Sequence, residues 1–452
     1  MMRDYTHRGP LAHLEIMAPT GTAEWVHDRH ALWNQVDATE RRKDSQLARA
    51  IEVALPVELS HEENIALVRD FIAQEFVSKG MIADFGICSR DPTNPHARIL
   101  LTLRHATSTG FGPKARHWNR KSTLVDWRAA WADAANRHLA RAGHAVRIDH
   151  RSLEAQHSEL APGRKIGIGR RRDGDETLPE HLKERVAERR RIAQENGETI
   201  LEDPTVALRA LAHQRSTFTE QDIIQFLMRR TDGAAQLEAA LRAIMESNEL
   251  VPLGAPDATP ARFTSRDLLE AEKSLLKRVS TMSGRRRRGL AAGVRSAGLA
   301  EHLRTEEERR VFDHLVGEGD LKVLAAADGS KSALLAAARR AWEAQGLKVS
   351  GFASSKIGAA NLQSSSGIRS RTLVERETAW TEGRDLLMLD EVCVVDGAEM
   401  IGVKQLERLL AVADKVRAKV VLVADAGQLE AMGAVSPMRM IIDRMGAQGV
   451  ER

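Results

Sequence analysis

The sequence has little that would support aromatic stacking, disulfide bonding or membrane insertion. Of its 452 residues only 4% are aromatic, one is tyrosine, and the two cysteines, Cys88 and Cys393, lie far apart. Few aromatics argue against base stacking as the main mode of nucleic-acid recognition. Two distant cysteines argue against a disulfide framework and for a reducing compartment. No run of ~18 apolar residues occurs, so we expect a cytoplasmic protein without membrane insertion.

Basic residues are gathered in short runs, although the formal net charge is only +4. RRRD lies at 170–173, ERRR at 188–191 and RRRR at 285–288. Such runs are either solvated helix faces and linkers or surfaces that neutralise nucleic-acid phosphates. We take the last run as a candidate DNA-binding element, made of Arg285, Arg286, Arg287 and Arg288.

The length predicts about three domains, and the patterning predicts a multidomain α+β and α/β protein. Residues 1–160 alternate strands and helices, with 81–88 and 96–104 as an antiparallel hairpin. Residues 161–204 are a basic linker or exposed helix. Residues 205–300 are helical, and a winged-helix-like module and a plain helical bundle explain them equally well. Residues 301–452 alternate apolar strands with helices, which predicts a parallel-sheet lobe.

In the last region a strand leads into AAADGSKSALL at 325–335, where a phosphate-binding loop belongs. Such a loop uses glycine amides and a lysine on the phosphates and a hydroxyl on Mg²⁺. Gly329, Lys331 and Ser332 are the candidates. The full pattern would place glycines at 325 and 330, which are Ala325 and Ser330 here, so the loop cannot wrap a nucleotide as closely.

Two later strands of this region end in carboxylates. DEVCVVD ends in Asp396, where a nucleotide hydrolase holds Mg²⁺, and VVLVAD ends in Asp425, with Gln428 three residues on. The residue after the metal-binding Asp is normally Glu but is Gly397 here, while Glu391 and Glu399 fall outside that register. Slow turnover is therefore expected. A Rossmann-like sheet without any ligand is the alternative interpretation.

Several segments together resemble the MobA/MobL relaxase domain followed by the RecD-like helicase part of TraA-type conjugative transfer proteins. The relaxase-like segments are DYTHRG (4–9), LWNQVDATERRKDSQLARAIEVALP (32–56), NPHARILLTLR (94–104), FGPKARHWN (111–119), WRAAWADAANRHLARAGH (127–144) and IDHRSL (148–153). The helicase-like segments are STFTEQDI, GLKVSGFASS, SGIRSRTL, MIGVKQLERLL and VVLVADAGQL. The resemblance runs through nearly the whole chain in one order.

The resemblance implies an HUH-relaxase-like antiparallel sheet and a P-loop ATPase lobe. It also implies a nuclease that nicks plasmid DNA at a transfer origin through a tyrosine, with Mg or Mn, ATP, single- or double-stranded plasmid DNA and other transfer proteins as cofactors and partners. The only tyrosine, Tyr5, belongs to the DYT motif. We therefore expect the nucleophile-bearing first strand, like the second motor lobe, to be missing from a truncated chain.

The family's three metal-binding histidines map onto Cys88, His96 and Arg98. A guanidinium has no lone pair for a metal, so the site is eroded, and Arg98 is better suited to a DNA phosphate. The sequence thus predicts a degenerate transfer protein that binds DNA with impaired nicking and ATPase activity. The alternatives are an active nickase or helicase using non-standard residues, and a non-functional gene fragment.

Overall fold

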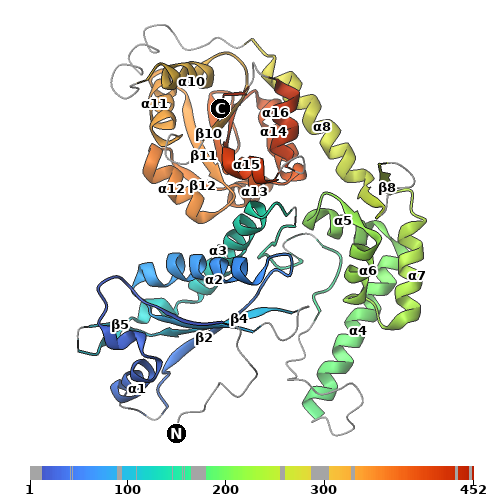
Figure 1. The fold of residues 1–452 in the computed structure, drawn as a ribbon. Helices are drawn as coiled ribbons and strands as arrows, with labels where there is room; N and C mark the ends of the chain where they lie inside the picture. Colours follow the sequence, from blue (N-terminus) through green and yellow to red (C-terminus); the bar gives the residue numbers. More distant parts are fainter. Residues whose placement is uncertain are drawn as a thin grey trace. The chain divides into compact units, whose positions relative to one another are not determined.

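The structure is a computed structural model, and it describes most of the chain in two compact units. The first unit reaches to His144, and the second takes up most of the remaining residues (Figure 1). The described residues are 13–40, 42, 44–88, 94–107, 109–144, 146–154, 156, 158–163, 180–254, 260–286, 305–326, 331–432, 436–446 and 450–451. Among them, no helix has the length and apolar character needed to cross a membrane.

The first unit is built on a four-stranded antiparallel sheet in the order β1-β3-β4-β2. Its strands are β1 (His13–Met17), β2 (Ala48–Ala54), β3 (Ala83–Cys88) and β4 (His96–Thr102). The predicted antiparallel pairing of β3 with β4 is confirmed, and it places the two ends of these strands, Cys88 and His96, opposite each other.

Helices α2 (His61–Glu75) and α3 (Lys121–Arg141) cover one face of this sheet. Ser60 begins α2 with a capping box in which its side chain accepts from the Glu63 amide, so two of the free amide groups at the helix start are satisfied. Alternate residues of β3 and β4, such as Phe85 and Ile99, enter the core with Phe71 of α2. The residues between them therefore point to the other face.

The other face is partly covered by α1 (Arg29–Thr39), which reaches the buried carboxylate of Asp84. Arg29 donates two short hydrogen bonds to Asp84, at 2.8 and 2.9 Å, and the indole of Trp33 donates a third at 2.8 Å. These bonds attach α1 to the sheet. The unit is completed by η2 (Glu24–His27), η3 (Val77–Lys79), β5 (Arg104–Ala106), β6 (Phe111–Lys114) and η4 (Arg116–Asn119).

The middle of the chain forms helices around a small antiparallel sheet of order β7-β9-β8. The helices are α4 (Glu180–Glu202), α5 (Thr205–Gln214), α6 (Glu220–Met228) and α7 (Gly233–Met245), and the strands are β7 (Phe218–Thr219), β8 (Leu250–Leu253) and β9 (Arg262–Ser265). Of the two expectations for 161–204, a basic linker or an exposed helix, residues 180–202 form a helix, and its last turns are partly buried because Ile200 lies in this core. A plain helical bundle does not account for the sheet.

The last part of the chain is a six-stranded parallel sheet in the order β12-β11-β13-β14-β10-β15. The predicted parallel sheet is confirmed. Its strands are β10 (Leu321–Ala326), β11 (Lys348–Ala353), β12 (Ser370–Thr372), β13 (Glu391–Asp396), β14 (Lys419–Asp425) and β15 (Val450–Glu451). Strands β10, β14 and β13 are neighbours and run the same way, so their carboxyl ends meet at one edge of the sheet.

Helices cover both faces of the parallel sheet and form an α/β/α lobe (Figure 1). One core contains α8 (Arg266–Ser283), α14 (Val403–Val416) and α16 (Pro437–Met445); the other contains α10 (Glu306–Val316), α11 (Lys331–Ala344) and α12 (Lys356–Ser366). The short segments α13 (Leu373–Thr381), η5 (Ala398–Met400) and α15 (Ala426–Met432) complete the lobe. Helix α8 lies before residue 301, yet Leu275 and Val279 belong to the lobe's core.

Candidate functional site

The three positions expected to bind a metal lie together at one end of the antiparallel sheet. Cys88 of β3 pairs in register with His96 of β4, and Arg98 follows two residues along, opposite Gly86. Ala97 and Ile99 point into the core beneath α2 and α3, so His96 and Arg98 share the opposite face. The register thus brings the three candidate positions, Cys88, His96 and Arg98, to one face of the sheet.

Both polar side chains on this face already have protein partners. The Nδ1 atom of His96 lies 3.1 Å from the carbonyl oxygen of Asn94. Arg98 donates from Nε to Glu52 of β2 at 3.3 Å, with the two side chains 43% and 56% exposed. An exposed pair of this kind exchanges readily with water and salt, so Arg98 can still turn to a phosphate.

The donor set at this end does not fit a divalent metal ion. Burial, opposed by Arg98 and assisted by Glu52, raises the pKa of the Cys88 thiol, and a protonated thiol is a poor ligand. The described residues contain no group of three or more His, Cys, Asp or Glu side chains that could hold a metal ion. Among the described residues, one imidazole and one protonated thiol are fewer donors than a phosphate-polarising metal ion needs.

The second group of candidates lies where β10, β14 and β13 end in the parallel lobe. Lys331 and Ser332 begin α11, directly after the loop that follows β10. Gly329 of that loop lies outside the described residues. A helix start at the carboxyl end of a parallel strand is a suitable place for phosphate, because free amide groups point outward there.

Lys331 and Asp425 form the central contact of this edge. The Nζ atom of Lys331 lies 3.7 Å from Oδ2 of Asp425, and both side chains are largely buried, at 12% and 15% exposure. Asp425 also accepts from the backbone amide of Gln428 at 2.8 Å. In the described part of the chain the buried Oε1 of Gln428 has no hydrogen-bond partner. The D-x-x-Q motif is therefore held next to the lysine.

A further carboxylate, on Glu399, joins this edge from β13. The strand ends at Asp396, and Gly397 then adopts a left-handed conformation with φ of 67°. The 3% exposed Glu399 follows in η5, and its Oε2 accepts from the backbone amide of Asp425 at 3.3 Å. Burial raises the pKa of Glu399 to about 7, opposed by its backbone hydrogen bonds and by Lys331 and assisted by Asp396.

The residue types at this edge fit a nucleoside triphosphate with Mg²⁺. Mg²⁺ at nucleotide sites is bound by one or two carboxylates together with substrate phosphates and water, so a protein cage of several ligands is not required. Asp396 and Ser332 would hold the ion, which would neutralise phosphate charge, and Lys331 would contact the phosphates. The unpartnered Oε1 of Gln428 provides a polar atom for a ligand or water.

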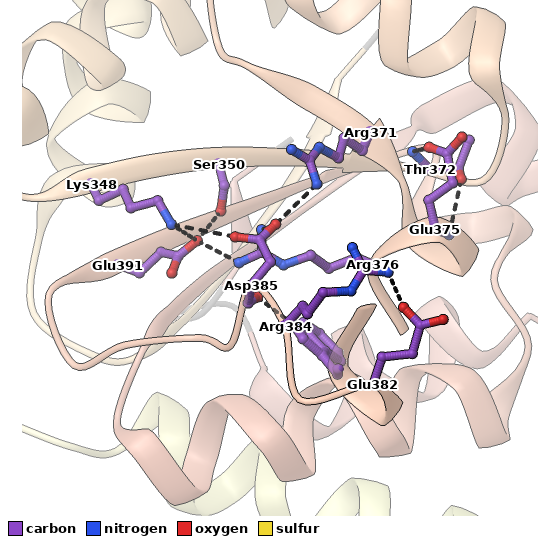
Figure 2. Close-up of polar contacts among 11 residues, drawn as sticks. Lys348, Ser350, Arg371, Thr372, Glu375, Arg376, Glu382, Arg384, Asp385 and Glu391 are labelled. Carbon is purple, nitrogen blue, oxygen red and sulfur yellow. Dashed lines mark hydrogen bonds and ion pairs between the residues drawn. The ribbon is translucent and has the colours of Figure 1, made fainter. Parts of the chain in front are cut away.

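Glu391, the other glutamate near this strand, lies at the opposite end of β13. It is fully buried and accepts from Ser350 at 2.6 Å and from Arg376 at 3.1 Å, as Figure 2 shows. Arg376 also contacts Asp385, and Lys348 lies 3.5 Å from Glu391. This ion-paired cluster occupies the amino edge of the sheet, away from the nucleotide candidates.

The four arginines of the basic run have different environments. Arg285 lies two residues after the end of α8 and forms ion pairs with Asp320 and Asp414, at 3.2 Å from Asp320. Asp320 directly precedes β10 and Asp414 belongs to α14, so Arg285 ties the end of α8 to both. Arg286 is exposed and lines a cavity of about 250 Å³ with Arg417 and Leu389. Arg287 and Arg288 lie outside the described residues. The structure therefore gives Arg285 a packing role and leaves Arg286 at the surface.

Comparisons with known proteins match both halves of the chain. The MobA/MobL family matches residues 1–173, and an AAA domain matches residues 304–451. The conjugal transfer protein TraA of Rhizobium radiobacter is 32% identical over 99% of this chain and 44% of its own length. A probable conjugal transfer protein TraA of Sinorhizobium fredii is 33% identical over the same shares. The mobilization protein MobL of Acidithiobacillus ferridurans is 32% identical over 49% of this chain and 69% of its own length.

The chain folds as an antiparallel α+β unit followed by a parallel-sheet lobe. Together with these matches, the fold defines a relaxase-type domain joined to an ATPase-type domain. The chain belongs to the MobA/MobL family, and its arrangement is that of the TraA conjugal transfer proteins. It spans 44% of the length of the TraA proteins that it matches.

Glu399 is the site residue that sequence reasoning missed. It lies three positions after Asp396, whereas the motif places the catalytic glutamate one position after the metal-binding aspartate. A usable signal was present in the glycine directly after an apolar strand, since glycine permits a left-handed turn that reverses the chain within one residue. Such a turn returns the next residues to the strand end.

Proposed function

We propose that this protein binds plasmid DNA at a transfer origin during conjugation and that its first unit nicks that DNA poorly or not at all. The proposal is carried by the face of the antiparallel sheet opposite α2 and α3, where Arg98 is exposed. There Arg98 offers a positive fork for a phosphate beside His96 and Cys88, whose donor set does not fit a divalent metal. We propose from the family, and not from the structure, that the bound DNA is a plasmid transfer origin, in single- or double-stranded form, and that other transfer proteins take part.

DNA binding is tested by fluorescence anisotropy with labelled single-stranded and double-stranded oligonucleotides at salt concentrations from about 50 to 200 mM. Affinity should fall steeply with salt because bound counterions are released from the phosphates. Arg98→Ala and Arg286→Ala should each reduce the salt slope by about 1, as the loss of one phosphate contact does. Arg285→Ala is the matched control, since its guanidinium is held by Asp320 and Asp414. Unchanged slopes for both test variants would contradict the proposed contacts.

Nicking is tested with supercoiled plasmid carrying a candidate origin, in the presence of Mg²⁺ or Mn²⁺. We expect binding without conversion to open circles. Nicking that is lost in His96→Ala would instead favour an active nickase that uses non-standard residues.

We further propose that the second unit binds a nucleoside triphosphate at the carboxyl edge of β10, β14 and β13. The supporting observation is the contact of Lys331 with Asp425 beside the unpartnered Oε1 of Gln428. A fluorescent ATP analogue should bind in the presence of Mg²⁺ and should lose at least about tenfold in affinity in Lys331→Ala. Equal affinity in the variant would contradict this proposal.

Domain limits of 1–160, 161–204, 205–300 and 301–452 remain a proposal from the sequence pattern, with two amendments: the end of α4 packs in the core of the middle region, and α8 packs in the core of the last lobe. A winged-helix-like identity is proposed for the middle region. The order α5, β7, α6, α7, β8, β9 supports that identity. Strands β8 and β9 follow the third helix and pair with each other, and β9 also pairs with the short β7 between the first two helices.

A further inference from the structure

The left-handed turn at Gly397 brings an acidic side chain back to the edge of the parallel sheet. Strand β13 ends at Asp396, η5 begins one residue later, and Glu399 lies in its middle. The carboxylate of Glu399 is held by the amide of Asp425, the last residue of the neighbouring strand β14. Asp425 is also the partner of Lys331. Glu399 thus belongs to the same cluster as the candidate phosphate-binding lysine.

We propose that Glu399 is the catalytic base of nucleoside triphosphate hydrolysis at this edge. The inference rests on the proposed binding of a nucleoside triphosphate there. In the step, the oxygen of water forms a bond to the γ-phosphorus while its proton passes to the carboxylate of Glu399. The bond from the γ-phosphorus to the bridging oxygen breaks, and its electron pair stays on the nucleoside diphosphate, so the products are the diphosphate and inorganic phosphate.

The surroundings of Glu399 suit this role. Its side chain is 3% exposed, so bulk water competes little for the carboxylate, and a fixed carboxylate can orient one water molecule. Its Oε2 accepts from the Asp425 amide, and a carboxylate has several lone pairs, so it can accept or take up a further proton from water. Lys331 and Asp396 both act electrostatically on it, which places it within the charged cluster rather than in the apolar core.

No other glutamate of β13 or its turn is equally well placed. Glu391 is bound by Ser350 and Arg376 at the amino end of β13, whereas phosphate-binding groups of parallel sheets lie at the carboxyl ends. A glutamate at position 397 would need the left-handed conformation that Gly397 adopts, with φ of 67°, and this conformation is strained for residues with a side chain. The local backbone therefore favours position 399 for the acidic group.

The test compares full-length wild-type protein with Glu399→Gln in three measurements. These are equilibrium binding of a fluorescent ATP analogue, single-turnover phosphate release with ATP and Mg²⁺, and thermal unfolding. Glutamine keeps the shape and can still accept from the Asp425 amide but cannot take a proton at neutral pH. We expect analogue affinity within about threefold of wild type, which is under 1 kcal/mol, an unfolding temperature no lower than wild type, and phosphate release at least about 10²-fold slower.

Glu430→Gln is the matched control. Glu430 is an exposed carboxylate of α15 at the same edge, so removing its charge should leave phosphate release at the wild-type rate. Slowed release in this variant as well would show a general charge effect and overturn the assignment. If Glu399→Gln does not unfold cooperatively, phosphate release is measured in Glu399→Asp instead. Aspartate keeps the negative charge but is shorter by one methylene, so its carboxylate lies farther from the water. Slow release in a folded Glu399→Asp supports the role, and a wild-type rate overturns it.

The outcomes separate this inference from the binding proposal on which it rests. Wild-type protein that binds the analogue but releases no phosphate keeps the binding proposal and overturns the catalytic role of Glu399. Wild-type protein that does not bind the analogue overturns both. If Glu399→Gln lowers the affinity for the analogue and the rate of phosphate release by the same factor, Glu399 contributes to binding, and its role as the base is overturned.

Discussion

Cys88 and His96 are directly paired across strands β3 and β4. Side chains of residues paired in this way have Cβ atoms about 5 Å apart, which is close enough to share one metal ion. Arg98 lies on the same face, two residues further along β4. The backbone therefore still presents three neighbouring positions for a metal, although only one of them is a histidine.

Restoring histidines at the two altered positions should create a metal site. We expect Cys88→His with Arg98→His to bind Mn²⁺ or Co²⁺ at least about tenfold more tightly than wild type, because three imidazoles would then converge on one face. Isothermal titration calorimetry measures the affinity. Adding His96→Ala should remove the gain; if it does not, the metal is bound elsewhere and the register does not define the site.

The Asp84 carboxylate should contribute more to stability than the surface pair of Arg98 and Glu52. Asp84→Asn weakens four hydrogen bonds from Arg29 and Trp33 at a side chain that is almost fully buried. We expect a loss of about 2 kcal/mol in the free energy of unfolding, measured by urea denaturation. Arg98→Ala, whose pair is exposed, should change it by less than about 0.5 kcal/mol. Equal losses would mean that burial does not set the strength of these pairs.

The regular elements around the candidate sites could be predicted from local pattern. The run HARILLTLR predicts a strand in which residues 97, 99 and 101 point inward. The runs VVLVAD and DEVCVVD predict buried parallel strands. Both signals depend only on residues close in sequence. The positions of His96, Asp396 and Asp425 at strand ends follow from these patterns, and the register of the structure agrees with them.

Partners far apart in sequence could not be predicted in the same way. Arg285 was read as a DNA contact from its basic run, but its partners Asp320 and Asp414 come from other elements. Glu391 falls outside the expected register, but its partners Arg376 and Ser350 at the amino edge of the sheet come from other elements and follow from no local pattern. Glu399 was set aside because its return to the edge depends on the φ angle of Gly397, which no periodicity reports.

The buried pair of Arg376 and Glu391 should show strong coupling in a double-mutant cycle. Arg376→Met leaves the carboxylate of Glu391, which is 0% exposed, with Ser350 and the more distant Lys348 as partners (Figure 2). We expect it to lower the free energy of unfolding by about 3 kcal/mol, because it leaves a buried charge poorly paired.

The double variant, Arg376→Met with Glu391→Gln, should recover part of that loss, since no buried carboxylate remains to be paired. Chemical denaturation followed by tryptophan fluorescence measures the cycle, and Trp380, which donates to the carbonyl oxygen of Asp385 at 3.0 Å, reports on this region. Additive losses would show that Arg376 acts through packing on Phe352 and Trp380 alone.

Asp70 should make the stability of the first unit depend on pH in the acid range. Its carboxylate on α2 lies 3.5 Å from His138 and 3.3 Å from Arg137, both on α3. The polar contact with the His138 ring, followed by the charge of Arg137, lowers the pKa of Asp70 to about 2 against opposing desolvation. Because the folded pKa lies below the ordinary 3.8, the folded state favours the ionised carboxylate, and the contribution is full above about pH 4 and lost as the pH falls toward 2.

Asp70→Asn should therefore be less stable than wild type at pH 7, and the difference should close between about pH 4 and pH 2. After a discount for the partial exposure of Asp70, the difference at pH 7 is about 1 kcal/mol. Urea denaturation at several pH values measures it through the tryptophans of the first unit, Trp25, Trp33, Trp118, Trp127 and Trp131. In a His138→Gln background the same difference should shrink, because the strongest partner of the carboxylate is gone. A difference that is constant from pH 7 to pH 2 would mean that Asp70 supports α2 through neutral hydrogen bonds, such as that from Gln74, rather than through its charge.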